Sequence, residues 1–117
     1  MKLLATICIF IGLTWTTSII AHDDVSLLSS SPKNNAMLMQ SPELIHLEFS
    51  QAVRLIKVSL TSEEVGNINF DFKPQTESQA VYEWKLPILK PATYEVRWTI
   101  LGEDGHAMNS SIGFMVH

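Results

Sequence analysis

The chain has little cysteine, little glycine and no excess of positive charge. Cys8 is the only cysteine in 117 residues, which excludes an internal disulfide framework and a cysteine-cluster metal site. None of the five glycines belongs to a GxGxxG or GxxxxGK[ST] loop, so the usual nucleotide-binding loops are absent. Eight basic residues against twelve acidic residues give a net charge of −4. This balance argues against nucleic acid or an anionic membrane surface as a partner.

The first 21 residues differ in composition from the rest of the chain. A lysine precedes an apolar run, a short polar stretch follows, and Ala21 is a small residue at a suitable cleavage point. This layout predicts a secretory signal peptide over residues 1–21. Cleavage after Ser18 is the main alternative site, and an uncleaved membrane anchor is the alternative interpretation. Cleavage after Ala21 leaves a single domain over residues 22–117 that begins at His22 and has no segment inserted in a membrane.

Apolar and polar residues alternate along most of the remaining chain. Short segments with a period of two, separated by proline and other turn residues, predict an all-β fold, a β-sandwich or barrel of about seven strands. Trp84 and Trp98 are expected in the core, and residues 81–86 are expected to form a strand. The residues expected to face inward are Ile45, Leu47, Phe49, Ile56, Val58, Leu60, Ile68, Phe70, Phe72, Tyr94, Val96, Trp98, Ile100, Ile112, Phe114 and Val116.

Two separate signals suggest a metal site. At a mature N-terminus, His22 offers its α-amine and its imidazole Nδ1 to one metal ion, although such a histidine is commonly an ordinary surface residue. Asp104, Gly105 and His106 combine a carboxylate and an imidazole in a tight turn, although Asp-Gly is also a common hairpin turn. Together these groups supply three nitrogens and one oxygen, which is a complete square-planar set for Cu(II).

Several motifs in order along the mature chain resemble the CopC family of periplasmic copper-binding proteins. The resemblance implies a Greek-key, immunoglobulin-like β-sandwich that binds one Cu(II) ion. By the same resemblance His22 contributes its amine and Nδ1, Asp104 a carboxylate oxygen and His106 an imidazole nitrogen. The matching pieces are Ala21-His22, Leu28-Ser29-Ser30-Ser31-Pro32, Ala36-Met37-Leu38, Ile45-His46-Leu47-Glu48-Phe49-Ser50, Tyr94-Glu95-Val96-Arg97-Trp98, Asp104-Gly105-His106 and Gly113-Phe114-Met115-Val116.

The chain also departs from the family pattern. Gln51 stands where many members carry an acidic residue, which removes a candidate outer carboxylate. Ala107 and Ser110 stand where proline and glycine are common, and these replacements predict a looser turn after His106. Residues 51–79 contain no methionine, so no Cu(I) site of the methionine-rich loop kind is expected there.

Four further residues are weaker candidates for a second metal site. Met37 and Met39 carry soft sulfur ligands for Cu(I), but they are interpreted as packing residues. His46 lies on the polar side of its segment and is interpreted as a solvated surface residue. His117 is interpreted as part of a frayed terminus.

The hypothesis from sequence is a periplasmic Cu(II)-binding protein for copper resistance, buffering or transfer to a CopD-type inner-membrane protein, and not an enzyme. One alternative is a copper-dependent oxidative enzyme, which would need an open copper position and a flat substrate face. A second alternative is a metal-free sandwich module for interactions, in which replacing His22 and His106 would change nothing. A hydrolase is poorly supported because no GxSxG motif occurs.

Overall fold

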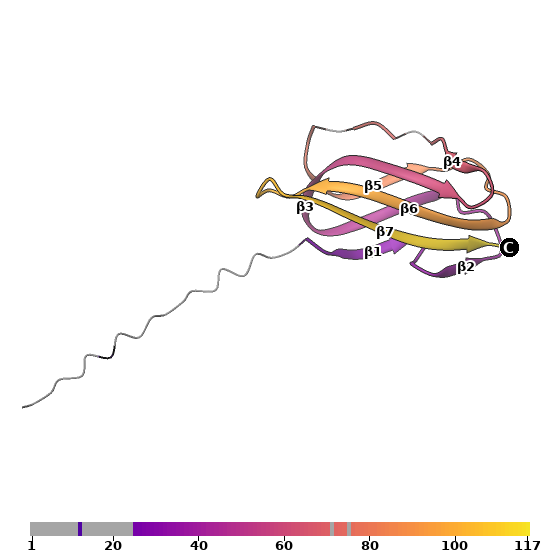
Figure 1. Ribbon diagram of the computed structural model, residues 1–117, viewed down its shortest axis with the longest axis horizontal. Helices are drawn as coiled ribbons and strands as arrows, with labels where there is room; N and C mark the ends of the chain where they lie inside the picture. The colour runs from indigo at the N-terminus through magenta and orange to yellow at the C-terminus, as the bar shows by residue number, and fades with distance from the viewer. Residues whose placement is uncertain (1–11, 13–24, 71, 75) are drawn as a thin grey trace, which may run out of the picture.

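The computed structural model describes residues 12, 25–70, 72–74 and 76–117, so His22 and nearly all of the predicted signal peptide lie outside the described residues. Within this part of the chain the fold is all-β with seven strands and no helix, as predicted (Figure 1). No described helix is therefore long and apolar enough to cross a membrane. The strands are β1 (Leu27–Ser31), β2 (Ala36–Leu38), β3 (Leu44–Ser62), β4 (Gly66–Ile68), β5 (Gln79–Lys85), β6 (Ala92–Leu101) and β7 (Ala107–Val116).

Strand β3 connects the two layers of the sandwich. Its first half pairs antiparallel with β1 and β5, and its second half pairs antiparallel with β6 and β4. The pairing with β5 is irregular between Glu48 and Val53, where the strand passes from one layer to the other. Strand β7 pairs antiparallel with β6 and parallel with β2, which completes the order β1-β3-β6-β7-β2.

The core lies between these layers and consists of the inward-facing residues of the alternating segments. Trp84 and Trp98 are buried in it, as predicted. The ring of Phe49 meets the rings of Tyr82 and Trp98 edge-on, at centroid separations of 6.3 and 6.1 Å. Burial of each large apolar side chain contributes roughly 1.5–3 kcal/mol of transfer free energy, so this cluster holds the two layers together.

Two expectations about inward-facing residues need correction. Ile56 is exposed, because a register shift between Leu55 and Lys57 makes it the extra residue of a bulge and turns Leu55 into the core instead. The strand expected across Ile68–Phe72 ends at Ile68. Phe70 and Phe72 lie beyond it and still pack edge-on against Trp84 at about 6 Å.

Candidate metal centre

The turn that connects β6 to β7 lies at one end of the sandwich (Figure 1). Leu101 and Ala107 form the last pair of the two strands, and residues 102–106 close the turn. The amide of Gly102 donates to the carbonyl of His106, and the amide of Gly105 donates to the carbonyl of Gly102, both at 3.0 Å. Gly105 has a φ of +83°, a conformation that favours glycine. The turn is therefore defined by its own short sequence.

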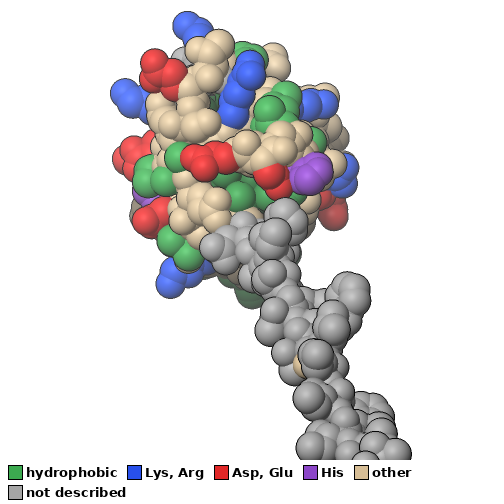
Figure 2. Space-filling view, turned by 90° about the vertical axis from the view of Figure 1, so that its left-hand side faces the viewer, with side chains coloured by type: hydrophobic (Ala, Val, Ile, Leu, Met, Phe, Trp, Pro, Cys, Tyr) green, Lys and Arg blue, Asp and Glu red, His purple; other side chains and the backbone are tan. Residues whose placement is uncertain are grey.

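Asp104 and His106 are in direct contact within this turn. Oδ1 of Asp104 accepts a hydrogen bond from the backbone N–H of His106 at 3.0 Å, and Oδ2 lies 2.9 Å from Nδ1 of the same residue. Both side chains remain open to solvent, at 48% exposure for Asp104 and 79% for His106. Figure 2 views this end of the molecule and has a histidine beside acidic side chains on its surface.

The spacing of the two side chains fits a small divalent ion. Imidazole nitrogens and carboxylate oxygens bind such ions at about 2.0–2.2 Å, so two ligands at adjacent corners of a square plane lie about 3 Å apart. The Nδ1 to Oδ2 separation of 2.9 Å matches that spacing. In the structure the two atoms point at each other as a hydrogen-bonded pair, so both exposed side chains must rotate to direct one nitrogen and one oxygen at the same ion.

Gly102 has a role in this geometry that sequence reasoning did not identify. A Cβ atom at this position would lie only 2.9 Å from Oδ1 of Asp104, closer than such atoms normally approach. The absence of a side chain at Gly102 therefore leaves room for the Asp104 carboxylate over the turn. The signal was present as a glycine two residues before the aspartate, but the close approach depends on how the turn folds.

The strand nearest to the N-terminus begins at the same end of the sandwich as the turn (Figure 1). Val25 lines a shallow depression of about 210 Å³ together with Ile100 and Met108, which face each other across β6 and β7 just before the turn. His22 precedes Val25 by three residues, and an extended chain of that length spans at most about 10 Å.

The structure thus brings together two of the three predicted ligands, Asp104 and His106. Among the described residues, no group of three or more His, Cys, Asp and Glu side chains could hold a metal ion. His22, the third predicted ligand, lies outside the described residues.

The other sequence candidates lie away from the turn. His46 is half-buried and not simply solvated, because its Nδ1 lies 2.7 Å from Oε1 of Glu83 on the neighbouring strand β5. Gln51 is half-buried in β3. The expected loosening after His106 is not found, since Ala107 pairs with Leu101 and Ser110 with Trp98 in a regular ladder.

The methionines at β2 are not packing residues. Met37 is 67% exposed and Met39 is 81% exposed, so the packing interpretation is wrong for both. The backbone of His117 is not frayed either, because its amide donates to the carbonyl of Leu38 at 2.8 Å. These residues lie at the opposite end of β7 from the turn (Figure 1).

Comparison with known families decides the relationship of the chain. Residues 27–117, which include all seven strands, match the model of the CopC domain. The chain belongs to the CopC family. No curated protein matches the sequence.

Solved structures with the CopC fold superpose well on this chain. CopC from Methylosinus trichosporium OB3b is 22% identical with a TM-score of 0.64, over 79% of this chain and 92% of that one. PcoC from Escherichia coli, described as a methionine-rich copper resistance protein, is 22% identical with a TM-score of 0.66, over 80% of this chain and 98% of PcoC. Its selenomethionine form gives 21% identity and a TM-score of 0.65, over 79% and 99% of the two chains. At this identity the similarity establishes a shared fold.

Proposed function

We propose that this CopC protein binds one Cu(II) ion at the β6–β7 turn and serves copper resistance in the periplasm. The observation that carries the proposal is the contact between Asp104 and His106, at a spacing suited to adjacent ligands of one ion. Membership of the CopC family supports copper as the cargo, and PcoC is described as a copper resistance protein.

His22 completes the proposed ligand set after removal of residues 1–21. Its α-amine and imidazole Nδ1 add two nitrogens to the nitrogen of His106 and the oxygen of Asp104. Cu(II) prefers a tetragonal arrangement of such nitrogen and oxygen ligands, and it lies at the top of the affinity order of the divalent first-row ions. The start of β1 beside the turn, and the short reach from Val25 to His22, are consistent with this assignment.

In this proposal the protein carries or buffers copper and does not catalyse a reaction. Four protein ligands fill the square plane, so no equatorial position remains for a substrate. Delivery to a CopD-type inner-membrane protein, or acceptance of copper from it, fits an exposed site at the end of the molecule. Copper-loaded protein is expected not to consume oxygen in the presence of a reductant. Sustained oxygen consumption would favour the oxidative enzyme.

The ligand role of His106 is tested by the variant His106→Ala. Loss of one nitrogen should weaken Cu(II) binding by at least about a hundredfold, since even indirect supporting groups change metal affinity by 10–100-fold. Affinity is measured by competition with a chelator, and retention of one copper is followed by native mass spectrometry. The control His46→Ala removes an imidazole that contacts Glu83 on the other layer and should leave Cu(II) affinity unchanged. An unchanged affinity in His106→Ala would refute the assignment.

The role of His22 is tested separately by the N-terminus. Protein recovered from a periplasm should have a mass that begins at His22. One extra residue placed before His22 should reduce Cu(II) affinity about as much as His106→Ala, because the α-amine then becomes a peptide nitrogen. A mass that begins at Ile19 or Met1, or a harmless extension, would exclude the N-terminal chelate.

A further inference from the structure

A second set of metal-binding side chains lies on the outer face of β2 and β7. The two strands run parallel, and Met37 on β2 is directly paired with Met115 on β7. Paired residues of neighbouring strands point to the same face of a sheet. Phe114 and Val116, the neighbours of Met115, are buried, so Met115 and its partner Met37 project from the opposite, outer face. Two thioethers that are 78 positions apart in sequence therefore stand side by side.

The pairing continues beyond the end of β2. The hydrogen bond from the His117 amide to the Leu38 carbonyl extends the contact of the two segments by one residue. Met39 and His117 are the residues that directly follow the ends of β2 and β7. Both side chains are exposed. Met37 and Met115 thus stand as a pair, with the exposed residues Met39 and His117 just beyond the ends of their strands, and we call these four residues the sulfur face.

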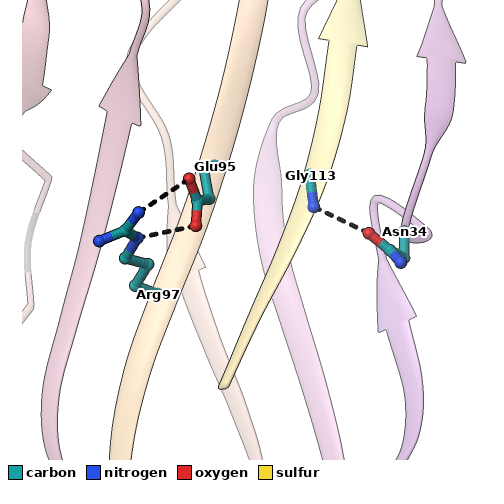
Figure 3. Close-up of polar contacts among 4 residues, drawn as sticks. All are labelled: Asn34, Glu95, Arg97 and Gly113. Carbon is teal, nitrogen blue, oxygen red and sulfur yellow. Dashed lines mark hydrogen bonds and ion pairs between the residues drawn. The ribbon is translucent and has the colours of Figure 1, made fainter. Parts of the chain in front are cut away.

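Short as it is, β2 is attached firmly to β7. The amide of Asn35 donates to the carbonyl of Gly113 at 2.6 Å, and the side-chain oxygen of Asn34 accepts from the amide of Gly113 at 2.9 Å (Figure 3). Together with the contact of His117 and Leu38, these bonds hold the three-residue strand at both ends. Ligands on paired strands keep their spacing better than ligands on loops.

The chemistry of the sulfur face selects a soft ion. Thioethers are soft ligands that bind Cu(I) in preference to Mg²⁺, Ca²⁺ or other oxygen-binding ions. Adjacent strands lie about 4.8 Å apart, and methionine has three rotatable bonds, so the sulfurs of Met37 and Met115 can converge on one ion. The shallow depression beside them, of about 250 Å³, is lined by Met37, Met115, Thr93, Phe114 and small or amide residues, and by no charged side chain.

We propose that Met37, Met39, Met115 and His117 form a binding site for a soft monovalent metal ion of the Cu(I) class. The site lies at the opposite end of β7 from Asp104 and His106, roughly 30 Å away for a ten-residue strand. It goes beyond the Cu(II) proposal and does not depend on it, since the two sites share no residue. It also lies outside residues 51–79, where the absence of methionine argues against a metal-binding loop.

Silver(I) is the probe of choice, because it has the ligand preference of Cu(I) and does not change oxidation state. Protein recovered from the periplasm and labelled with ¹³C at the methionine methyl groups is titrated with Ag(I) and followed by NMR. One equivalent should shift the methyl resonances of Met37, Met39 and Met115. Met108 provides an internal control, because it is half-buried on the same strand near the turn. Absence of these shifts, or an equal shift of Met108, would overturn the proposal.

Variants then separate this site from the turn. The double variant Met37→Leu/Met115→Leu should lower the affinity for Ag(I), and for Cu(I) under anaerobic competition, by at least about tenfold. The matched control Met108→Leu should change it by less than about twofold, because volume-conserving core substitutions are well tolerated. His106→Ala should leave Ag(I) affinity unchanged while Cu(II) affinity falls. Equal losses of Ag(I) affinity in the double variant and in Met108→Leu would also refute the sulfur face.

Discussion

The two ends of β7 differ both in their ligand atoms and in how the backbone places them. At the Ala107 end, the nitrogen and oxygen groups proposed as Cu(II) ligands lie two residues apart and are set by a five-residue turn and its own hydrogen bonds. At the Val116 end, methionines from two distant segments, proposed as soft-metal ligands, lie side by side because two strands pair in one register. The comparison shows that one strand can carry two chemically different groups of side chains at its two ends. The group at the Ala107 end is positioned by local sequence, and the group at the Val116 end is positioned by the complete fold.

Among substitutions outside the proposed ligands, the largest effect that separates the two ends is expected from Gly102→Ala. The added Cβ would lie 2.9 Å from Oδ1 of Asp104 and must displace that carboxylate from its place over the turn. Cu(II) affinity should fall about tenfold or more, as for the loss of a group that orients a ligand, with Ag(I) affinity unchanged. Gly113→Ala is the matched control for Cu(II), because its Cβ would sit at an ordinary 3.5 Å from the Tyr94 carbonyl. Full Cu(II) affinity in Gly102→Ala would contradict this role.

A smaller effect, confined to the other end, is expected from Asn34→Ala. The substitution removes the side-chain acceptor of the Gly113 amide and loosens β2 on β7. The free energy of unfolding should fall by about 0.5–1.5 kcal/mol, which urea denaturation measures, and Ag(I) affinity should fall a few-fold. Asn109→Ala removes a comparable amide near the other end of β7, where it accepts from the Thr99 hydroxyl, and serves as the control for Ag(I) affinity. A drop in Cu(II) affinity in Asn34→Ala would show that the ends are not independent.

The smallest effect concerns the middle of the sheet, between the two ends. Nε of Arg97 donates to Oε1 of Glu95 at 2.7 Å, and this hydrogen bond holds the pKa of Glu95 below its ordinary value (Figure 3). A lowered folded-state pKa stabilises the protein above the unfolded pKa, and this contribution is lost as pH falls through the folded pKa. In Arg97→Gln the pKa of Glu95 should rise toward its ordinary value, as monitored by NMR of the side-chain carboxyl carbon.

The effect of Arg97→Gln on stability near neutral pH should be slight, because the pair is exposed and screened by solvent. Binding of Cu(II) and Ag(I) should be unchanged, since neither proposed site includes Glu95 or Arg97. An unchanged pKa of Glu95 would count against the hydrogen bond as its cause, and altered metal binding would count against the separation of the two ends.

Features that depend on residues close together in the sequence could be predicted from the sequence, and features that depend on distant residues could not. The alternation in β6 predicts its buried side directly, because a regular strand has a period of two. Ile56 breaks this rule because a bulge changes the phase of β3 without a hydrophobic signal. Asp104 and His106 were predicted together because their contact spans only two residues. The involvement of His22 stays a prediction, since it lies outside the described residues.

The sulfur face could not be predicted from the sequence because it depends on the pairing of two segments that lie far apart in the chain. From the sequence, Met37 and Met39 were interpreted as packing residues and His117 as part of a frayed terminus. Nothing in the pattern around Met37 indicates that β2 pairs parallel with β7, or in which register. A shift of one residue in that pairing would place Met37 beside buried Phe114 or Val116 in place of Met115. Packing of Ala36 and Leu38 against the core therefore specifies the register through the tertiary fold.

The separation of the paired strands in the sequence also affects when, during folding, the Asp104–His106 pair and the methionine cluster form. The β6–β7 hairpin joins segments separated by one short turn, whereas β2 must meet β7 across nearly the whole length of the domain. Closing a long loop costs more chain entropy, and contacts that are distant in sequence form slowly. We therefore expect the aspartate–histidine pair to be assembled early in folding, and the methionine cluster to appear only when the last strands dock. Soft-metal binding would then report on the finished molecule.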